Sequence, residues 1–345
     1  MWIILAALLF LTIDLFLFPR VLPYEMTLEP HQSWTLSENS SSVASDSQFF
    51  RLGEWEGAWS PSNGLGRVRA LKLQEDVSPH EVAWRDAAHN SIVVEGVRGK
   101  LFELVGEQYP FWVRDRLFTM DENRMTLSAW GPTGQALWSK SFASLVTAID
   151  ASQLFTVVGT LDGRVQVFDN KGASAGEFQP GGSRLSVVYN VSLSSDDRRI
   201  LVLAGLDPKR FLILERGGSD YRPVYHRPLR ENHPWPTPLG FLNGKDIAYY
   251  EKVGSLGLVN PASPERETDI AIQGEIGDVV SAEGEKLIFL LDKGTPLGVL
   301  RVASTDGTPV LALPYQGSNA FLKLSRHELL LGLDQSLLLF DVRFQ

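Results

Sequence analysis

The chain is built around one recurring unit, a pair of short apolar strands joined by a tight turn. Its clearest copy lies in Leu154 to Phe178, which is predicted to form three short strands joined by two tight turns. There, Leu154 to Thr160 is apolar and β-branched, Leu161-Asp162-Gly163 is a turn, and Arg164 to Phe168 alternates polar and apolar residues. Asp-Gly between two such runs predicts a β-hairpin, because glycine adopts the positive φ of the turn without strain.

Similar strand-turn-strand pieces follow one another at intervals of 25, 38, 46, 47, 40 and 41 residues. They begin at Ser91, Arg116, Leu154, Ile200, Ile247, Leu287 and Glu328. Each piece follows another short apolar strand, such as Glu81-Val82-Ala83-Trp84, and most precede a fourth, weaker one. Four strands repeated at this spacing are typical of the blades of a β-propeller. We therefore expect an all-β protein, a β-propeller of seven four-stranded blades.

The two ends of the repeat predict how the ring closes. The seventh unit stops at Gln345, directly after its third strand. Arg67 to Leu73 alternates cleanly and precedes the first unit, so we expect this N-terminal strand to complete the last blade and remove its open edge. Six blades is the alternative if the short first interval divides one blade into two. A pair of β-sandwiches is a further alternative, but no linker stands out near the middle of the chain.

The N-terminus carries an almost uninterrupted apolar run from Trp2 to Phe18. Its seventeen residues are at the short end of what spans a bilayer. No Lys or Arg precedes the run and no A-x-A site follows it, which favours an uncleaved transmembrane helix in residues 1–20 over a cleaved signal peptide. Asp14 lies inside the run. It either snorkels with Arg20 near one end or contacts a polar group on a neighbouring membrane helix.

The remaining chain is predicted to have two parts. Residues 21–48 are rich in Ser, Asn and Asp and are expected to form a polar tether, and residues 49–345 the propeller. A short N-terminal anchor usually acts as an export signal, and a large chain without cysteine is tolerated in an oxidising compartment. We therefore expect a single-pass protein of the inner (cytoplasmic) membrane with its propeller on the periplasmic side.

Composition excludes several classes of chemistry. The 32 basic and 41 acidic residues give a net charge of −9 without a basic run, so nucleic acid is not an expected partner. The absence of cysteine excludes disulfides, thiolate metal sites and a cysteine nucleophile. Six scattered histidines provide no metal-ligand spacing, and no G-x-S-x-G, H-E-x-x-H or phosphate-loop motif occurs. No catalytic residue, metal or cofactor is predicted, and aspartates near the hairpins are attributed to turns.

Two segments resemble known propeller repeats. Val191 to Leu203, VSLSSDDRRILVL, resembles the S-P-D-G-x-x-apolar step of WD-repeat and related bacterial propellers. Thr133 to Trp138, followed by Gly159 to Asp169, is similar to the quinoprotein-like repeat, in which a Trp docks between blades. The resemblance implies the fold and leaves the function open, because propellers include both enzymes and scaffolds. Quinoprotein dehydrogenases carry a vicinal cysteine pair at the cofactor, and this chain has none.

One segment is a candidate binding surface. Tyr221 to Pro238, YRPVYHRPLRENHPWPTP, is predicted to be a long loop rich in the Tyr, Trp and Arg that dominate interface hot spots. The candidate partner-binding residues are Tyr225, His226, Arg227, Arg230, His233 and Trp235. The alternative is that these aromatic residues only cover a blade edge.

The predicted function is a membrane-anchored scaffold for other membrane or envelope proteins. The alternative is an envelope enzyme or small-ligand sensor that uses the funnel of the propeller. Inward-facing carboxylates around the central channel would favour the enzyme. An apolar or merely polar channel, with an aromatic patch near Trp235, would favour the scaffold.

Overall fold

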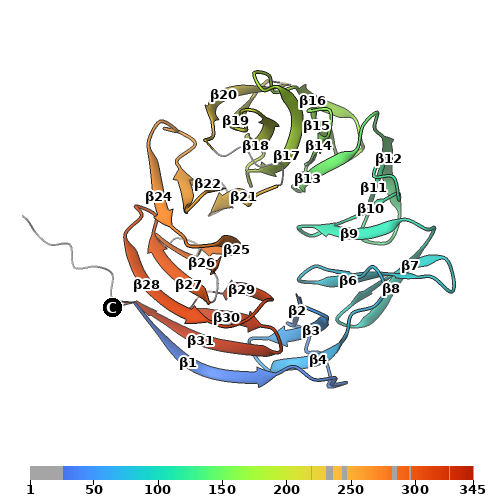
Figure 1. Ribbon diagram of the computed structural model, residues 1–345. Coiled ribbons are helices and arrows are strands. Elements are labelled where there is room, and N and C mark those ends of the chain that lie inside the picture. Colours follow the sequence, from blue (N-terminus) through green and yellow to red (C-terminus); the bar gives the residue numbers. More distant parts are fainter. Residues whose placement is uncertain are drawn as a thin grey trace, which may run out of the picture.

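The computed structural model describes residues 26–218, 220–230, 236–242, 247–281, 286–294, 297–325 and 327–344, and these form an all-β ring (Figure 1). The predicted transmembrane segment, residues 1–20 with Asp14, lies outside the described residues. Within the described part of the chain, no helix has the length and hydropathy needed to span a bilayer.

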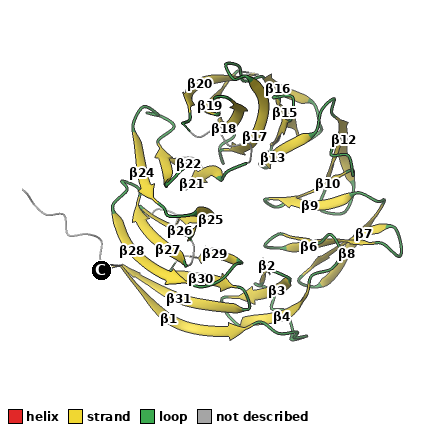
Figure 2. Cartoon of the chain, viewed as in Figure 1, coloured by secondary structure: helices red, strands yellow, loops and turns green. Residues whose placement is uncertain are grey.

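The strands form eight antiparallel sheets, which we call blades 1 to 8, around a common axis (Figure 2). Blade 1 comprises β2 (Gln48–Leu52), β3 (Trp55–Ser60) and β4 (Gly64–Ala70). Blade 2 comprises β5 (Asp76–Val77), β6 (Glu81–Asp86), β7 (Ser91–Gly96) and β8 (Gly99–Val105). Blade 3 comprises β9 (Tyr109–Val113), β10 (Arg116–Met120), β11 (Thr126–Trp130) and β12 (Ala136–Ser141). Blade 4 comprises β13 (Val146–Ala151), β14 (Phe155–Thr160), β15 (Val165–Asp169) and β16 (Ser174–Phe178).

The second half of the ring continues in the same way. Blade 5 comprises β17 (Leu185–Leu193), β18 (Arg199–Leu206), β19 (Arg210–Gly217) and β20 (Asp220–Pro228). Blade 6 comprises β21 (Leu239–Leu242), β22 (Ile247–Lys252), β23 (Ser255–Val259) and β24 (Glu267–Ala271). Blade 7 comprises β25 (Glu275–Ser281), β26 (Leu287–Lys293), β27 (Gly298–Ser304) and β28 (Pro309–Tyr315). Blade 8 comprises β29 (Ala320–Ser325), β30 (Glu328–Leu333), β31 (Ser336–Phe344) and β1 (Met26–Thr35).

The propeller fold is confirmed, but the prediction of seven blades is wrong, since the described residues form eight. The short interval between Ser91 and Arg116 comes from a difference in phase: Ser91 begins the third strand of blade 2, whereas Arg116 begins the second strand of blade 3. Both pieces therefore belong to complete blades. The missing blade is the first one, Gln48 to Ala70, whose hairpin of Gly, Trp and Glu carries little of the β-branched signal of the other units.

An N-terminal strand closes the ring, as expected, but it is a different strand. Arg67 to Leu73 overlaps β4, the outer strand of blade 1. The closing strand is β1, which pairs with β31 from Met26↔Phe344 to Thr35↔Ser336. It comes from the segment that was predicted to be a tether, so that prediction is wrong for residues 26–35.

The outer strand of a blade is largely exposed, so the sequence of β1 is polar. It therefore lacks the apolar pattern from which the other strands were predicted. Only Met26 is buried in the core, and most other residues of the strand face solvent. Its polar side chains make contacts across the strands: Glu29 Oε2 lies 2.8 Å from Arg343 Nη2, and His31 Nδ1 lies 3.4 Å from Asp341 Oδ2. Such cross-strand pairs stabilise a sheet modestly without an apolar pattern in the sequence.

The open edge of three-stranded blade 1 is covered by the chain that follows β1. Asn39 and Val68 exchange both backbone hydrogen bonds, at 2.9 Å each, in an isolated bridge on the outer side of β4. A β-carbon on Gly66 would lie 3.2 Å from the carbonyl oxygen of Ser42, so this covering segment packs closely on the strand. The edge is therefore protected from pairing with another chain.

The hydrophobic core is divided among the junctions between blades. Eight clusters of buried apolar side chains occur among the described residues, and each draws on two neighbouring blades. At the junction of blades 3 and 4, Trp138 packs between Phe118 and Phe168, with ring centroids 6.1 and 5.9 Å away. A Trp thus docks between blades, as the resemblance implied. Each blade packs against two neighbours. The ring is therefore held together by apolar contacts between blades rather than by the hydrogen bonds of any single sheet.

Candidate functional site

Acidic side chains of the inner half of the ring bind the backbone of the next blade. A carboxylate near the axis accepts a hydrogen bond from a backbone N–H of the following blade at four junctions. The pairs are Trp112 N to Asp76, Leu193 N to Asp150, Ile276 N to Glu251 and Leu322 N to Asp278, at 2.6, 2.6, 3.3 and 2.9 Å. Burial raises the pKa of Asp76, Glu251 and Asp278, and these N–H groups oppose the shift. We call these contacts blade staples.

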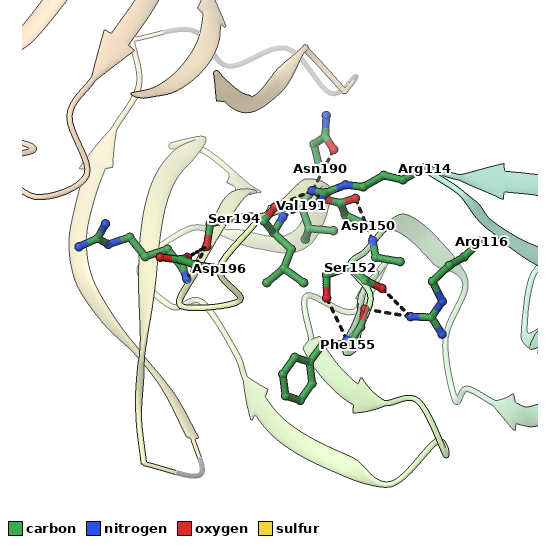
Figure 3. A network of polar contacts seen from close by, with 12 residues as sticks. Arg114, Arg116, Asp150, Ser152, Phe155, Asn190, Val191, Ser194 and Asp196 are labelled. Carbon is green, nitrogen blue, oxygen red and sulfur yellow. Dashed lines mark hydrogen bonds and ion pairs between the residues drawn. The ribbon is translucent and has the colours of Figure 1, made fainter. Parts of the chain in front are cut away.

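The staple at Asp150 joins three blades (Figure 3). Its Oδ2 accepts from Leu193 N at 2.6 Å and from Arg114 Nη2 at 2.7 Å, while Oδ1 accepts from Ala151 N at 2.8 Å. Arg114 Nη2 also donates to the carbonyl oxygen of Leu193 at 2.5 Å. Blades 3, 4 and 5 therefore meet at one carboxylate, whose oxygens are occupied by structural donors.

Asn190 occupies the equivalent place in blade 5. Its Oδ1 accepts from Val191 N at 2.9 Å, and its Nδ2 donates to the carbonyl oxygen of Thr237 at 3.0 Å. An amide replaces the carboxylate here because the partner in the next blade is a carbonyl, which needs a donor. The signal in the sequence is an Asp or Asn followed by a small or β-branched apolar residue near the end of an inner strand. Sequence reasoning considered only aspartates at turns and missed it.

The ring-closing junction uses a cation. Lys323 of β29 donates from Nζ to the carbonyl oxygen of Phe49 in β2 at 2.7 Å. Burial lowers the pKa of Lys323 to about 8 from its usual 10.5. The folded protein therefore holds a charged group that water would solvate better.

The stability of the protein should depend on pH through Lys323. Below pH 8 both states hold the ammonium and the folded state bears its full cost; between about 8 and 10.5 the unfolded chain binds more protons, so stability rises with pH. The wild type should gain on the order of 3 kcal/mol over this window relative to Lys323→Met. Urea denaturation of both proteins from pH 7 to 10.5 measures the difference. Parallel pH profiles would contradict the assignment.

The predicted loop from Tyr221 to Pro238 is largely a strand, so that prediction is wrong. β20 spans Asp220–Pro228 and forms the outer edge of blade 5. Pro223 and Pro228 read as loop residues, but an outer strand tolerates proline because its far side needs no backbone donor. His233 and Trp235 lie outside the described residues.

The other candidate residues of this segment do not converge. Tyr225 packs edge-on against Phe211, with ring centroids 6.4 Å apart. Arg227 forms an ion pair with Glu267 of blade 6. The ring of His226 is exposed, with Nδ1 3.5 Å from Nη1 of Arg210, and Arg230 is exposed. Their role in partner binding stays a prediction.

Two clefts flank blade 3. The first, of about 490 Å³ between blades 2 and 3, is walled by Phe102, Trp112 and Trp130 and includes Glu81 and Asp115. We call it the blade 2/3 cleft. The second cleft, of about 620 Å³, lies between blades 3 and 4. It includes Tyr109, Phe111, Val113 and Met120 of blade 3 and Val146, Thr147, Ala148 and Ile149 of β13.

The two clefts open on opposite faces of the ring. Strands of a blade alternate in direction, so the β9–β10 and β11–β12 turns share one face and the β10–β11 turn lies on the other. The blade 2/3 cleft contains Asp115 and Pro132 from the first pair of turns, whereas the other cleft contains Glu122 from the β10–β11 turn.

A smaller cavity of about 350 Å³ lies beside the Asp150 staple. It is lined by Arg114, Asp150, Ser192 and Tyr249, with apolar neighbours from β13 and β21. Burial raises the pKa of Tyr249 to about 12, and the charges of Asp278 and Asp150 add to the shift. The phenol is therefore a proton donor at neutral pH and not a base. No group of metal-ligating side chains occurs among the described residues.

A closed ring of eight radial sheets, with a Trp docked at a blade junction and Asp-centred turns, defines a β-propeller of the WD-repeat and quinoprotein-like kind. The chain belongs to a protein family described as beta-propeller protein, whose model matches residues 1–344.

One relative and two solved structures are similar to this chain. An uncharacterized protein of Treponema pallidum (strain Nichols) is 26% identical over 241 residues, which cover 68% of this chain. The match covers 61% of that relative's length. The crystal structure of BamB from Moraxella catarrhalis has a TM-score of 0.62 at 12% identity and covers 91% of this chain and 100% of that one. A chain in the crystal structure of the mitotic checkpoint complex has a TM-score of 0.57 at 14% identity, covering 92% of each. At these identities, both structures show a shared fold alone.

Proposed function

We propose that this propeller is a protein-protein interaction scaffold, held at the membrane by its N-terminal segment and serving other membrane or envelope proteins. The observation that carries the proposal is the blade 2/3 cleft, where Trp112, Trp130 and Phe102 lie beside two carboxylates, Glu81 and Asp115, that form no ion pair among the described residues. Aromatic residues beside charged groups in a recess are characteristic of interface hot spots.

The staples support a scaffold over a catalytic funnel. Asp76, Asp150, Glu251 and Asp278 accept backbone hydrogen bonds that tie one blade to the next. Their oxygens therefore have a structural role, which a catalytic carboxylate would have to give up. A propeller of similar fold also occurs in the mitotic checkpoint complex, a multi-protein assembly by its title. The cavity beside Arg114 and Tyr249 keeps a small-ligand sensor as the second candidate, because the Tyr249 hydroxyl has no hydrogen-bond partner among the described residues.

The position of β1 favours a short link between the proposed anchor and the ring. β1 begins at Met26, so only residues 21–25 separate it from the proposed transmembrane segment, residues 1–20. A fully extended chain spans at most about 3.6 Å per residue, so blade 8 would lie within about 20 Å of the bilayer surface. In this proposal the ring is held close to the inner membrane, on its periplasmic side, and partners would meet it there.

Site-specific photocrosslinking in cells tests the scaffold. We expect benzoylphenylalanine in place of Leu137, an exposed residue of the blade 2/3 cleft, to capture a discrete envelope protein identified by mass spectrometry. The matched control replaces Val253, an exposed apolar residue at the β22–β23 turn of blade 6. The same proteins from both positions, or none from Leu137, would contradict the proposal.

A further inference from the structure

We propose that the blade 2/3 cleft binds a basic side chain, Arg or Lys, presented by the partner protein. This inference rests on the proposed scaffold function and names the chemistry of the partner at that site. It comes from two carboxylates that share the cleft without an ion-pair partner among the described residues, and from the aromatic walls beside them.

Glu81 and Asp115 lie in the cleft as an unneutralised pair. Glu81 belongs to β6 and Asp115 to the β9–β10 turn. Neither carboxylate accepts a hydrogen bond or forms an ion pair with any residue that the structure describes. Burial raises the pKa of Glu81 and the charge of Asp115 adds to this shift, whereas His80 opposes it. An incoming cation would remove the repulsion and restore the lost solvation.

The basic side chains already in the cleft form no ion pair with Glu81 or Asp115 among the described residues. Arg116 donates from Nη1 to the carbonyl oxygens of Ser152 and Phe155, at 3.0 and 3.2 Å, on blade 4 (Figure 3). Its guanidinium also lies 5.3 Å from the ring centroid of Phe118. His80 is exposed and forms no ion pair with either carboxylate in the described part of the chain. Among the described residues, no ion pair joins Arg116 to Glu81 or Asp115.

The walls of the cleft fit the flat or elongated body of a basic side chain. Trp112 and Trp130 are partly exposed there, and the face of an indole ring attracts a cation. The volume of about 490 Å³ exceeds what one side chain needs, which leaves room for the segment that carries it. The net charge of −9 also favours approach of a basic partner.

A pair of matched probes tests the charge requirement on the full chain. Nα-acetylargininamide and Nα-acetylcitrullinamide have nearly the same shape, but only the first is a cation. Isothermal titration should give affinity for the arginine probe at least about tenfold above that for citrulline, since tenfold corresponds to a single charge-assisted contact. Equal binding of the two probes, no binding of either, or binding of maltotriose in their place would overturn the inference. In the last case the Trp walls would serve a saccharide.

Glu81→Gln gives a second, independent measurement. It should lower the affinity for the arginine probe about tenfold. Glu122→Gln, the same change at an exposed residue of the opposite cleft, should leave that affinity unchanged. A carboxyl whose pKa is raised on folding stabilises the protein below its unfolded pKa and loses that contribution as pH rises through the folded pKa. Above its folded pKa, the buried Glu81 carboxylate therefore destabilises the folded state, and Glu81→Gln should raise Tm there. A lower Tm would make Glu81 a structural residue and overturn the inference.

The outcomes separate this inference from the scaffold proposal. Capture of a partner from position 137 without binding of the arginine probe would keep the scaffold and reject the cation site. Binding of the probe without capture would keep the cation site and reject the scaffold.

Discussion

A chain that begins at Leu36, and so lacks β1, should fail to form a closed ring and should aggregate. β1 contributes nine paired positions to β31 and covers its full length. Without it, β31 presents a long apolar strand, SLLLFDVRF, with an unpaired backbone edge, which is a template for pairing with other chains. Size-exclusion chromatography and thermal unfolding measure the effect. A monodisperse truncated protein with one cooperative transition would show that the ring closes by other means.

Two controls isolate the role of the strand. A chain that begins at Met26 retains β1 and should unfold in the same cooperative transition as the full protein. A synthetic peptide of residues 26–35, added during refolding of the shorter chain, should restore soluble monomer, because the strand is joined to blade 8 only through backbone pairing and side-chain contacts.

Asp150→Ala should cost about 3 kcal/mol of unfolding free energy, the largest effect we expect from one polar substitution in this ring. The change leaves Leu193 N and Ala151 N without acceptors and Arg114 without its carboxylate. A buried donor that loses its partner costs more than the hydrogen bond contributed, because water cannot reach it. Urea denaturation monitored by tryptophan fluorescence measures the loss.

The polarity of the acceptor can be separated from its charge. Asp150→Asn keeps the size, but its amide nitrogen would face donors if it replaced Oδ2, so most of the loss should persist. Arg114→Gln should cost less, about 1 kcal/mol, because the Arg114 side chain is 41% exposed. If Asp150→Ala changes stability by less than Arg114→Gln, the three-blade staple is not what holds this junction.

The sequence predicted the type of fold well because the second and third strands of most blades are buried and apolar. Leu154 to Phe168, Ile200 to Leu214 and Leu287 to Val302 each appear as a hairpin in the structure. The blade count failed where this signal is weak. β3 carries Glu56 in its interior, paired with Arg67 and Arg69, so a buried strand looked polar.

The site was harder to predict because its residues come together only in three dimensions. Glu81 and Asp115 are 34 residues apart and meet in one cleft because blades 2 and 3 are neighbours. The segment from Tyr221 to Pro228 attracted attention for its composition, yet its proline residues mark an outer strand. Composition identified aromatic and basic side chains there, but their direction depends on the strand register, which no local pattern reveals.

The closure through β1 also decides how the ring responds to mechanical load. β1 belongs to blade 8 but continues along the chain into blade 1, so a pull on Met26 loads the β1–β31 ladder first and reaches blade 1 through residues 36–47. A pull along the strand axis loads all nine pairs together, whereas a pull at right angles opens the Met26–Phe344 pair first. The ring should therefore resist sliding forces far better than peeling ones, and blade 8 is where it would open.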